Sequence, residues 1–101
     1  MIIQLDKSDR KDKKWRVIID GKTKNKKTIH FGSKGMEDYT IHNDDLRKLR
    51  YTNRHKKREN WNKSGIKTAG FWSKHLLWNK KTIRDSIKDI ENKYNVDILY
   101  R

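Results

Sequence analysis

The chain of 101 residues contains no cysteine. This absence excludes disulfide bonds and thiolate metal sites, and it is compatible with a reducing interior compartment. A long hydrophobic run is missing as well, because the apolar residues among positions 1–5 are followed by Asp6 and a charged stretch up to Lys14. That segment is too short for a signal peptide or a membrane span, so we expect a soluble protein with no membrane partner.

Apolar residues are scarce. They make up 32% of the chain, against 40% charged residues, so the core must be thin. Four Trp, four Tyr and two Phe are present, and each aromatic side chain buries on the order of 150–250 Å². Because tryptophans and apolar clusters recur from Trp15 to Tyr100, we predict a single folded domain over residues 1–101 rather than a disordered tail.

Acidic residues are few compared with basic ones. The chain has 13 Asp and Glu against 27 Lys and Arg, which gives a formal net charge of +14. The surplus Lys and Arg side chains repel one another in the free protein, and binding to a polyanion relieves this repulsion. Nucleic acid is the commonest partner of this kind, so the composition favours a nucleic-acid-binding protein.

Residues 15–31 have the pattern of a β-hairpin. Trp15, Val17 and Ile19 alternate with outward residues, Asp20 and Gly21 open a turn, and positions 28–31 resume β-forming residues. Residues 22–27 form a lysine-rich tip that is too polar to pack. The apolar residues at positions 2–5 predict a third strand at the edge of the sheet, and the glycines and polar residues at positions 32–42 predict a loop.

The sequence predicts a basic helix from Asn43, as its cap, to about Glu59, with Asp44 and Asp45 in the first turn, where the positive end of the helix dipole favours them. Its expected apolar edge is narrow and consists of Leu46, Leu49 and Asn53. The other arc of the predicted helix carries Arg47, Arg50, Tyr51, Arg54 and Arg58.

Two further helices and a closing strand are predicted. Residues 69–79 hold the densest apolar cluster and predict a short buried helix. Thr82 and Asp85 resemble a capping box before a helix that Asn95 can end in a left-handed conformation, and residues 96–100 alternate as a strand. We therefore predict an α+β fold, in which a small antiparallel sheet, made of the N-terminal hairpin and the C-terminal strand, packs against about three helices.

The strongest functional pattern is a run of cations without an acid. Helical spacing places its arginines near one side, where they match a ridge of phosphates better than a solubilising face would. The predicted nucleic-acid-binding residues of this run are Arg47, Lys48, Arg50, Arg54, Lys56, Lys57 and Arg58.

A second basic element is the hairpin tip together with the following loop. Lysines at an exposed turn suit non-specific phosphate contact, although they also keep hairpins soluble. The residues predicted to bind here are Lys22, Lys24, Lys26, Lys27 and Lys34. We expect the helix and the hairpin tip to form one positive surface that neutralises duplex phosphates.

Other chemistry has weaker support in the sequence. The four histidines lack a short paired spacing, so no metal site and no cofactor are predicted. Asp38, His42, Asp44 and Asp45 offer an alternative as a metal-dependent nuclease site, but the two later acids also suit a helix N-terminus. Trp61, Trp72 and Trp78 could stack on unpaired bases, whereas their aliphatic neighbours favour a place in the core.

Four stretches resemble a known family. They are Ile29-His-Phe-Gly-Ser, Asp38-Tyr-Thr-Ile-His42, Arg50-Tyr-Thr-Asn-Arg-His-Lys-Lys-Arg-Glu-Asn-Trp61 and Thr68-Ala-Gly-Phe-Trp-Ser-Lys-His-Leu-Leu-Trp78. Together they resemble the small basic DNA-condensing core proteins of mimivirus-like giant DNA viruses. The resemblance covers most of the chain, and it implies a non-enzymatic protein that packages the genome in the virion core and is made in the viral factory of the host cytoplasm. It assigns a role to no individual residue.

The expected function is therefore sequence-independent binding of double-stranded DNA, which coats and condenses a viral genome. Condensation requires bridging, which self-association or two positive faces on one monomer would supply. We expect a homodimer or a higher assembly, because thin cores often gain from shared burial. The alternatives are an RNA-binding protein, a site-specific regulator, the metal-dependent nuclease, or a structural linker that binds acidic proteins or an anionic membrane.

Overall fold

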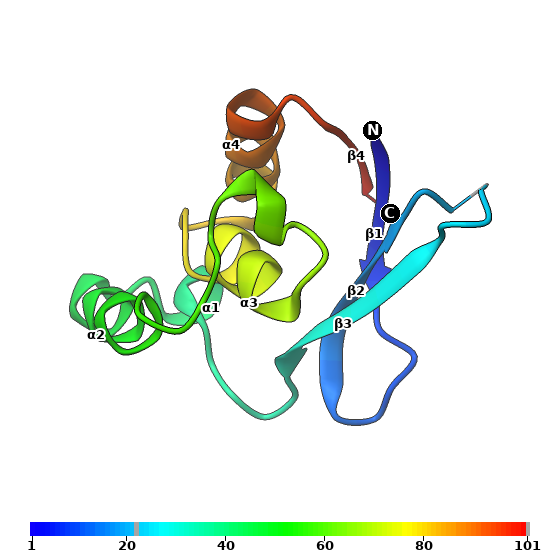
Figure 1. The fold of residues 1–101 in the computed structure, drawn as a ribbon. Coiled ribbons are helices and arrows are strands. Elements are labelled where there is room, and N and C mark those ends of the chain that lie inside the picture. The colour runs from blue at the N-terminus through cyan, green and yellow to red at the C-terminus, as the bar shows by residue number, and fades with distance from the viewer. Residues whose placement is uncertain (22, 101) are drawn as a thin grey trace.

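Four strands form a mixed sheet with the order β3-β2-β1-β4 (Figure 1). The computed structural model describes residues 1–21 and 23–100. β1 (Ile2–Lys7), β2 (Lys13–Ile19) and β3 (Lys27–Ser33) pair antiparallel in chain order, whereas β4 (Asp97–Tyr100) runs parallel to β1. The α+β class and the hairpin are confirmed. The strand predicted at the edge lies inside the sheet, because β4 pairs with its free side.

The register of the strands aligns their apolar residues on one face. Val17 lies opposite Leu5 on one side and Ile29 on the other, and Val17 and Leu5 are completely buried. The predicted inward face of β2 is therefore confirmed. Trp15 is half-buried at its rim, with its ring centroid 5.9 Å from that of Tyr100.

The helical segments follow β3 in the chain. They are α1 (Tyr39–His42), α2 (Asp45–His55), the 3₁₀ turn η1 (Lys63–Gly65), α3 (Ala69–Trp72), the π-helical turn η2 (Ser73–Leu77) and α4 (Ile83–Tyr94). Residues of α3, η2 and α4 pack on the apolar face of the sheet, whereas α2 lies away from it (Figure 1). Phe71, Trp72 and Leu76 from α3 and η2 are completely buried, as is Ile90 of α4. None of the helices in the described residues is long and apolar enough to cross a bilayer.

Local signals set the ends of α4 as predicted. The Thr82 hydroxyl accepts a hydrogen bond from the Asp85 backbone N–H at 3.1 Å, which satisfies one of the free donors of the first turn. Asn95 ends the helix in the left-handed conformation, with a φ of 54°. The buried helix predicted for residues 69–79 forms as α3 followed directly by η2.

The predicted start and end of the basic helix are wrong. Asn43 does not begin α2, because it ends α1 in a left-handed conformation with a φ of 52°. α1 itself lies within the segment predicted to be a loop. Asp44 caps α2 by accepting from the N–H groups of Leu46 and Arg47, and the helix ends at His55 rather than near Glu59. Two adjacent residues with good capping chemistry thus serve two successive helices.

The side of α2 that faces the protein also differs from the prediction. Leu46 and Leu49 are each 54% exposed, whereas Tyr51, assigned to the basic arc, is only 7% exposed. The Tyr51 ring stacks on Trp78 with centroids 4.4 Å apart and an interplanar angle of 2°. The flat ring of Trp78 stacks on the flat ring of Tyr51, and this contact explains why Tyr51 rather than Leu46 or Leu49 faces the protein.

Candidate nucleic-acid interface

Three arginines lie along the exposed side of α2. Arg47, Arg50 and Arg54 occupy positions i, i+3 and i+7, which fall on one face of a helix, and all three are exposed. The row continues into the turn after α2, where Lys56, Lys57 and Arg58 are also exposed. Arg58 was predicted on the helix but lies beyond its last residue.

These cations are largely uncommitted within the protein. Arg47 donates to Glu37 at 2.9 Å in an exposed ion pair, a type of pair that contributes little stability. Among the described residues, Arg50, Arg54 and Arg58 take part in no salt bridge. Their charges are therefore available to an external anion.

Lys48 behaves differently from the other predicted binding residues of α2. Its ammonium donates to the Asn79 backbone carbonyl at 2.6 Å and lies 4.8 Å from the centroid of the Tyr39 ring. The side chain is half-buried and joins α2 to the segment before α4. Its charge serves an internal contact.

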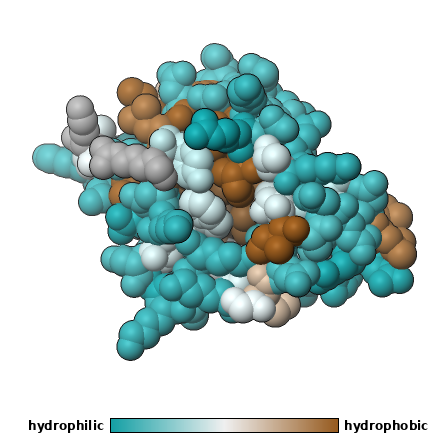
Figure 2. All heavy atoms as spheres, turned by 180° about the vertical axis from the view of Figure 1, so that it is seen from behind, coloured by the Kyte–Doolittle hydropathy of each residue, from teal (hydrophilic) through white to brown (hydrophobic). Residues whose placement is uncertain are grey.

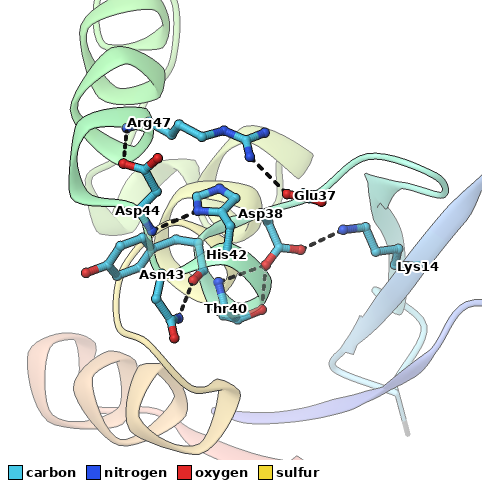
Figure 3. A network of polar contacts seen from close by, with 9 residues as sticks. Lys14, Glu37, Asp38, Thr40, His42, Asn43, Asp44 and Arg47 are labelled. Atoms are coloured by element: carbon cyan, nitrogen blue, oxygen red, sulfur yellow. Dashed lines mark hydrogen bonds and ion pairs between the residues drawn. The ribbon is translucent and has the colours of Figure 1, made fainter.

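A network of polar contacts at α1 links β2 to the start of α2 (Figure 3). Asp38, which is 2% exposed, receives the Lys14 ammonium of β2 at 2.6 Å and also caps α1 by accepting from the Thr40 N–H at 3.0 Å. His42 Nδ1 accepts from the Asp44 N–H at 2.9 Å. The network thus connects the strand β2, through α1, to the residue that caps α2.

The same contacts bear on the alternative nuclease site. Asp38 is engaged by Lys14 and α1, Asp44 caps α2, and Asp45 accepts a hydrogen bond from the Tyr39 hydroxyl. In the described part of the chain, no group of three or more His, Asp or Glu side chains is arranged to hold a metal ion. Each carboxylate considered for that site has a structural partner.

The lysine tip of the hairpin does not join the α2 surface. β2 and β3 run from an end at Lys13 and Ser33, which lies near α2, to an end at Ile19 and Lys27, where the tip begins. Figure 1 shows the tip and α2 at opposite ends of the molecule, whose longest extent is 41 Å. The prediction of one continuous surface is therefore wrong. The tip lysines found exposed are Lys24, Lys26 and Lys27, and Lys22 lies outside the described residues.

A pair of lysines that the sequence patterns did not single out lies beside α2 in the fold. Lys13 and Lys14, at the start of β2, line a cleft of about 350 Å³ together with Arg54 and His55 of α2. Lys34, predicted to act with the hairpin tip, is exposed at this same end of the sheet. The doublet is visible in the sequence, but only the tertiary structure shows which end of the strand meets the helix.

The tryptophans divide between core and surface. Trp72 is completely buried, and its indole N–H donates to the Ile66 carbonyl at 2.7 Å. Trp78 and Trp61 are half-buried, and the Lys74 ammonium lies 5.5 Å from the centroid of the Trp61 ring. The core role is confirmed for Trp72.

Most of the surface seen from behind is hydrophilic, with hydrophobic residues visible in small separate areas (Figure 2).

The fold and this surface define a small basic α+β protein with an exposed arginine row. The chain belongs to a family of unknown function, DUF5754, whose model matches residues 3–55. The match runs from β1 through the end of α2, and so includes the α1 network and the arginine row. Comparisons with curated proteins and with solved structures found no match.

Proposed function

We propose that this protein binds the phosphates of double-stranded DNA without reading sequence, and that it coats and condenses the DNA. The observation that carries the proposal is the row of exposed arginines on α2, of which Arg50 and Arg54 have no salt-bridge partner among the described residues. Guanidinium groups bind phosphate through two parallel N–H donors, and a helix of 11 residues is roughly 16 Å long, enough to follow several phosphates.

The net charge of +14 supports the same function. It raises the rate of encounter with any polyanion, and the release of counterions from DNA makes binding favourable at moderate salt. The resemblance to giant-virus core proteins extends the proposal to the genome inside such a virus particle, with a structural rather than an enzymatic role.

The test is a salt titration of binding to unrelated duplexes, measured by fluorescence anisotropy. For the wild type we expect equal affinity for all sequences and a log–log salt dependence of about −0.9 per phosphate contacted. Replacing Arg50, Arg54 and Arg58 together by Gln should reduce the slope by about 0.9 for each phosphate that is no longer neutralised.

A matched variant controls for the removal of three charges. Three other exposed cations lie outside α2 and the hairpin tip, namely Lys67, Arg84 and Lys88. Their replacement by Gln should leave most of the salt dependence of DNA binding unchanged. Equal effects of the two triple variants would reject α2 as the binding surface. A strong preference of the wild type for one duplex, or for structured RNA, would favour a site-specific regulator or an RNA-binding protein instead.

A further inference from the structure

The cleft between the sheet and α2 has the size and lining of a ligand site. Its volume of about 350 Å³ is within the range of roughly 300–1,000 Å³ typical of small-molecule sites. Phe31 of β3, Leu77 of η2 and Trp78 contribute apolar and aromatic surface, and Tyr51 of α2 lines it as well. The cleft therefore offers apolar and aromatic surface to a flat ligand.

One wall of the cleft is a stack of three rings. Tyr51 lies between Trp78, with centroids 4.4 Å apart, and His55, with centroids 4.3 Å apart. His55 is at the outer end of this stack, and its side chain is 29% exposed. An unpaired nucleobase can extend such a stack, because every base offers a flat π face.

The wall also carries a free donor. Tyr51 is more than nine-tenths buried, and within the described residues its hydroxyl has no hydrogen-bond partner, although it is not among the atoms sealed from solvent. Burial, and then the negative charge of Glu59, raises the pKa of this hydroxyl to about 12. The group stays protonated at neutral pH and can donate to a ring nitrogen or a carbonyl of a ligand.

The charges around the cleft favour an anion. Of the acids that line it, Asp38 is paired with Lys14 and Glu37 with Arg47. Lys13 and Arg54 also line the cleft and have no salt-bridge partner in the described part of the chain. Two cations thus remain for a phosphate beside an aromatic interior, which is the combination that a nucleotide presents.

We propose that this cleft binds a single unpaired nucleotide, with the base against the Tyr51 stack and the phosphate between Lys13 and Arg54. The proposal rests on the proposed function, because the DNA bound by the arginine row would supply the nucleotide. Arg54 belongs both to the cleft and to this row. It adds a preference for duplexes that contain an extrahelical base.

The test compares one duplex with the same duplex carrying a single bulged adenosine, by anisotropy at fixed salt. The wild type should bind the bulged duplex at least about 5-fold more tightly, the lower end of what one stacked base contributes. Ala69 is exposed and lines the cleft, so Ala69→Trp should fill it and abolish the preference. Ala69→Ser is the matched control and should keep it.

A second variant addresses the hydroxyl alone. Tyr51→Phe keeps the ring stack and should reduce the preference, while both Tyr51→Phe and Ala69→Trp should bind the plain duplex as the wild type does. A titration with deoxyadenosine monophosphate, followed by NMR, distinguishes free nucleotides from nucleotides within a strand. Chemical-shift changes at cleft residues would show that the cleft also binds free nucleotides. No chemical-shift changes, together with a preference for the bulged duplex, would limit the site to nucleotides within a strand.

Failure of this inference is distinct from failure of the proposed function. Equal binding of plain and bulged duplexes, with no mononucleotide binding, would overturn the cleft proposal and leave the arginine row intact. Preference for the bulged duplex with negligible affinity for the plain one would overturn duplex coating and keep the cleft.

Discussion

His75 shows how a single residue couples this fold to pH. The side chain is 7% exposed, its ring centroid lies 4.4 Å from that of Phe71, and its Nε2 is 2.9 Å from the Trp61 carbonyl oxygen. Burial lowers its pKa from the ordinary value of 6.5, and the positive charges of Lys74 and Lys93 lower it further, against the opposing effects of the Trp61 carbonyl and Asp89. The folded protein therefore favours the neutral imidazole.

A pKa that is lower in the folded than in the unfolded state makes stability depend on pH in one direction. Well above pH 6.5 both states hold a neutral imidazole, and as the pH falls through that value the unfolded state binds the proton first. We expect the free energy of unfolding, measured with urea, to decrease between pH 7 and pH 5, and less so in His75→Gln. An NMR titration of the His75 ring with a midpoint at or above 6.5 would contradict this.

Some single residues could be predicted from the sequence and others could not. Thr82 with Asp85 and Asn95 were predicted correctly, because each acts through its own backbone and near neighbours. The role of Asn43 was predicted wrongly, because Asn is common both at a left-handed helix end and at a helix start. Asp44, the next residue, can cap a helix equally well. The choice between them depends on α1, a four-residue helix with little apolar pattern of its own.

At the scale of the element, the exposed side of α2 can be predicted from the charge of its residues, whereas its buried side depends on packing against the rest of the protein. The basic side of this helix was predicted because a run of cations without an acid has to face solvent. Its buried side was predicted wrongly, because the partner that selects Tyr51 is Trp78, distant in sequence. The cleft beside α2 was missed for the same reason: its walls come from β2, β3, α2 and η2.

The packing of α2 gives a direct stability prediction. Tyr51→Ala removes a buried ring from between two stacked neighbours and should destabilise the protein by roughly 3–5 kcal/mol, as large aromatic truncations do. Leu49→Ala removes an exposed side chain and should change the free energy of unfolding by no more than about 0.5 kcal/mol. Urea unfolding of both variants measures the difference, and a larger destabilisation by Leu49→Ala would mean that α2 is rotated about its axis.

At the scale of the whole molecule, two basic regions lie on opposite sides of the fold (Figure 1). One is the arginine row of α2, and the other is the tip that carries Lys24, Lys26 and Lys27. Condensation requires contacts with two DNA segments. A pair of separated regions would let one monomer make both contacts, so the homodimer expected from the sequence is not required for bridging.

The bridging prediction can be measured by the capture of a labelled duplex on beads that carry a second duplex. Replacing Lys24, Lys26 and Lys27 by Gln should strongly reduce capture while leaving most of the affinity for a single duplex, because the arginine row is unchanged. The Lys67, Arg84 and Lys88 variant is the control for charge. Full capture by the tip variant, together with a dimer in sedimentation velocity, would assign bridging to self-association.

The pairing of β1 with β4 has a consequence for how the protein is made. β1 is synthesised before β4, so its second hydrogen-bonding edge is completed only when Asp97–Tyr100 follows. Until β4 has been made, the β1–β3 meander therefore presents the unpaired edge of β1, the kind of edge on which neighbouring chains add. Addition of β4 replaces the six-residue edge of β1 by the four-residue edge of β4, and a shorter edge offers fewer unpaired backbone groups to a neighbouring chain.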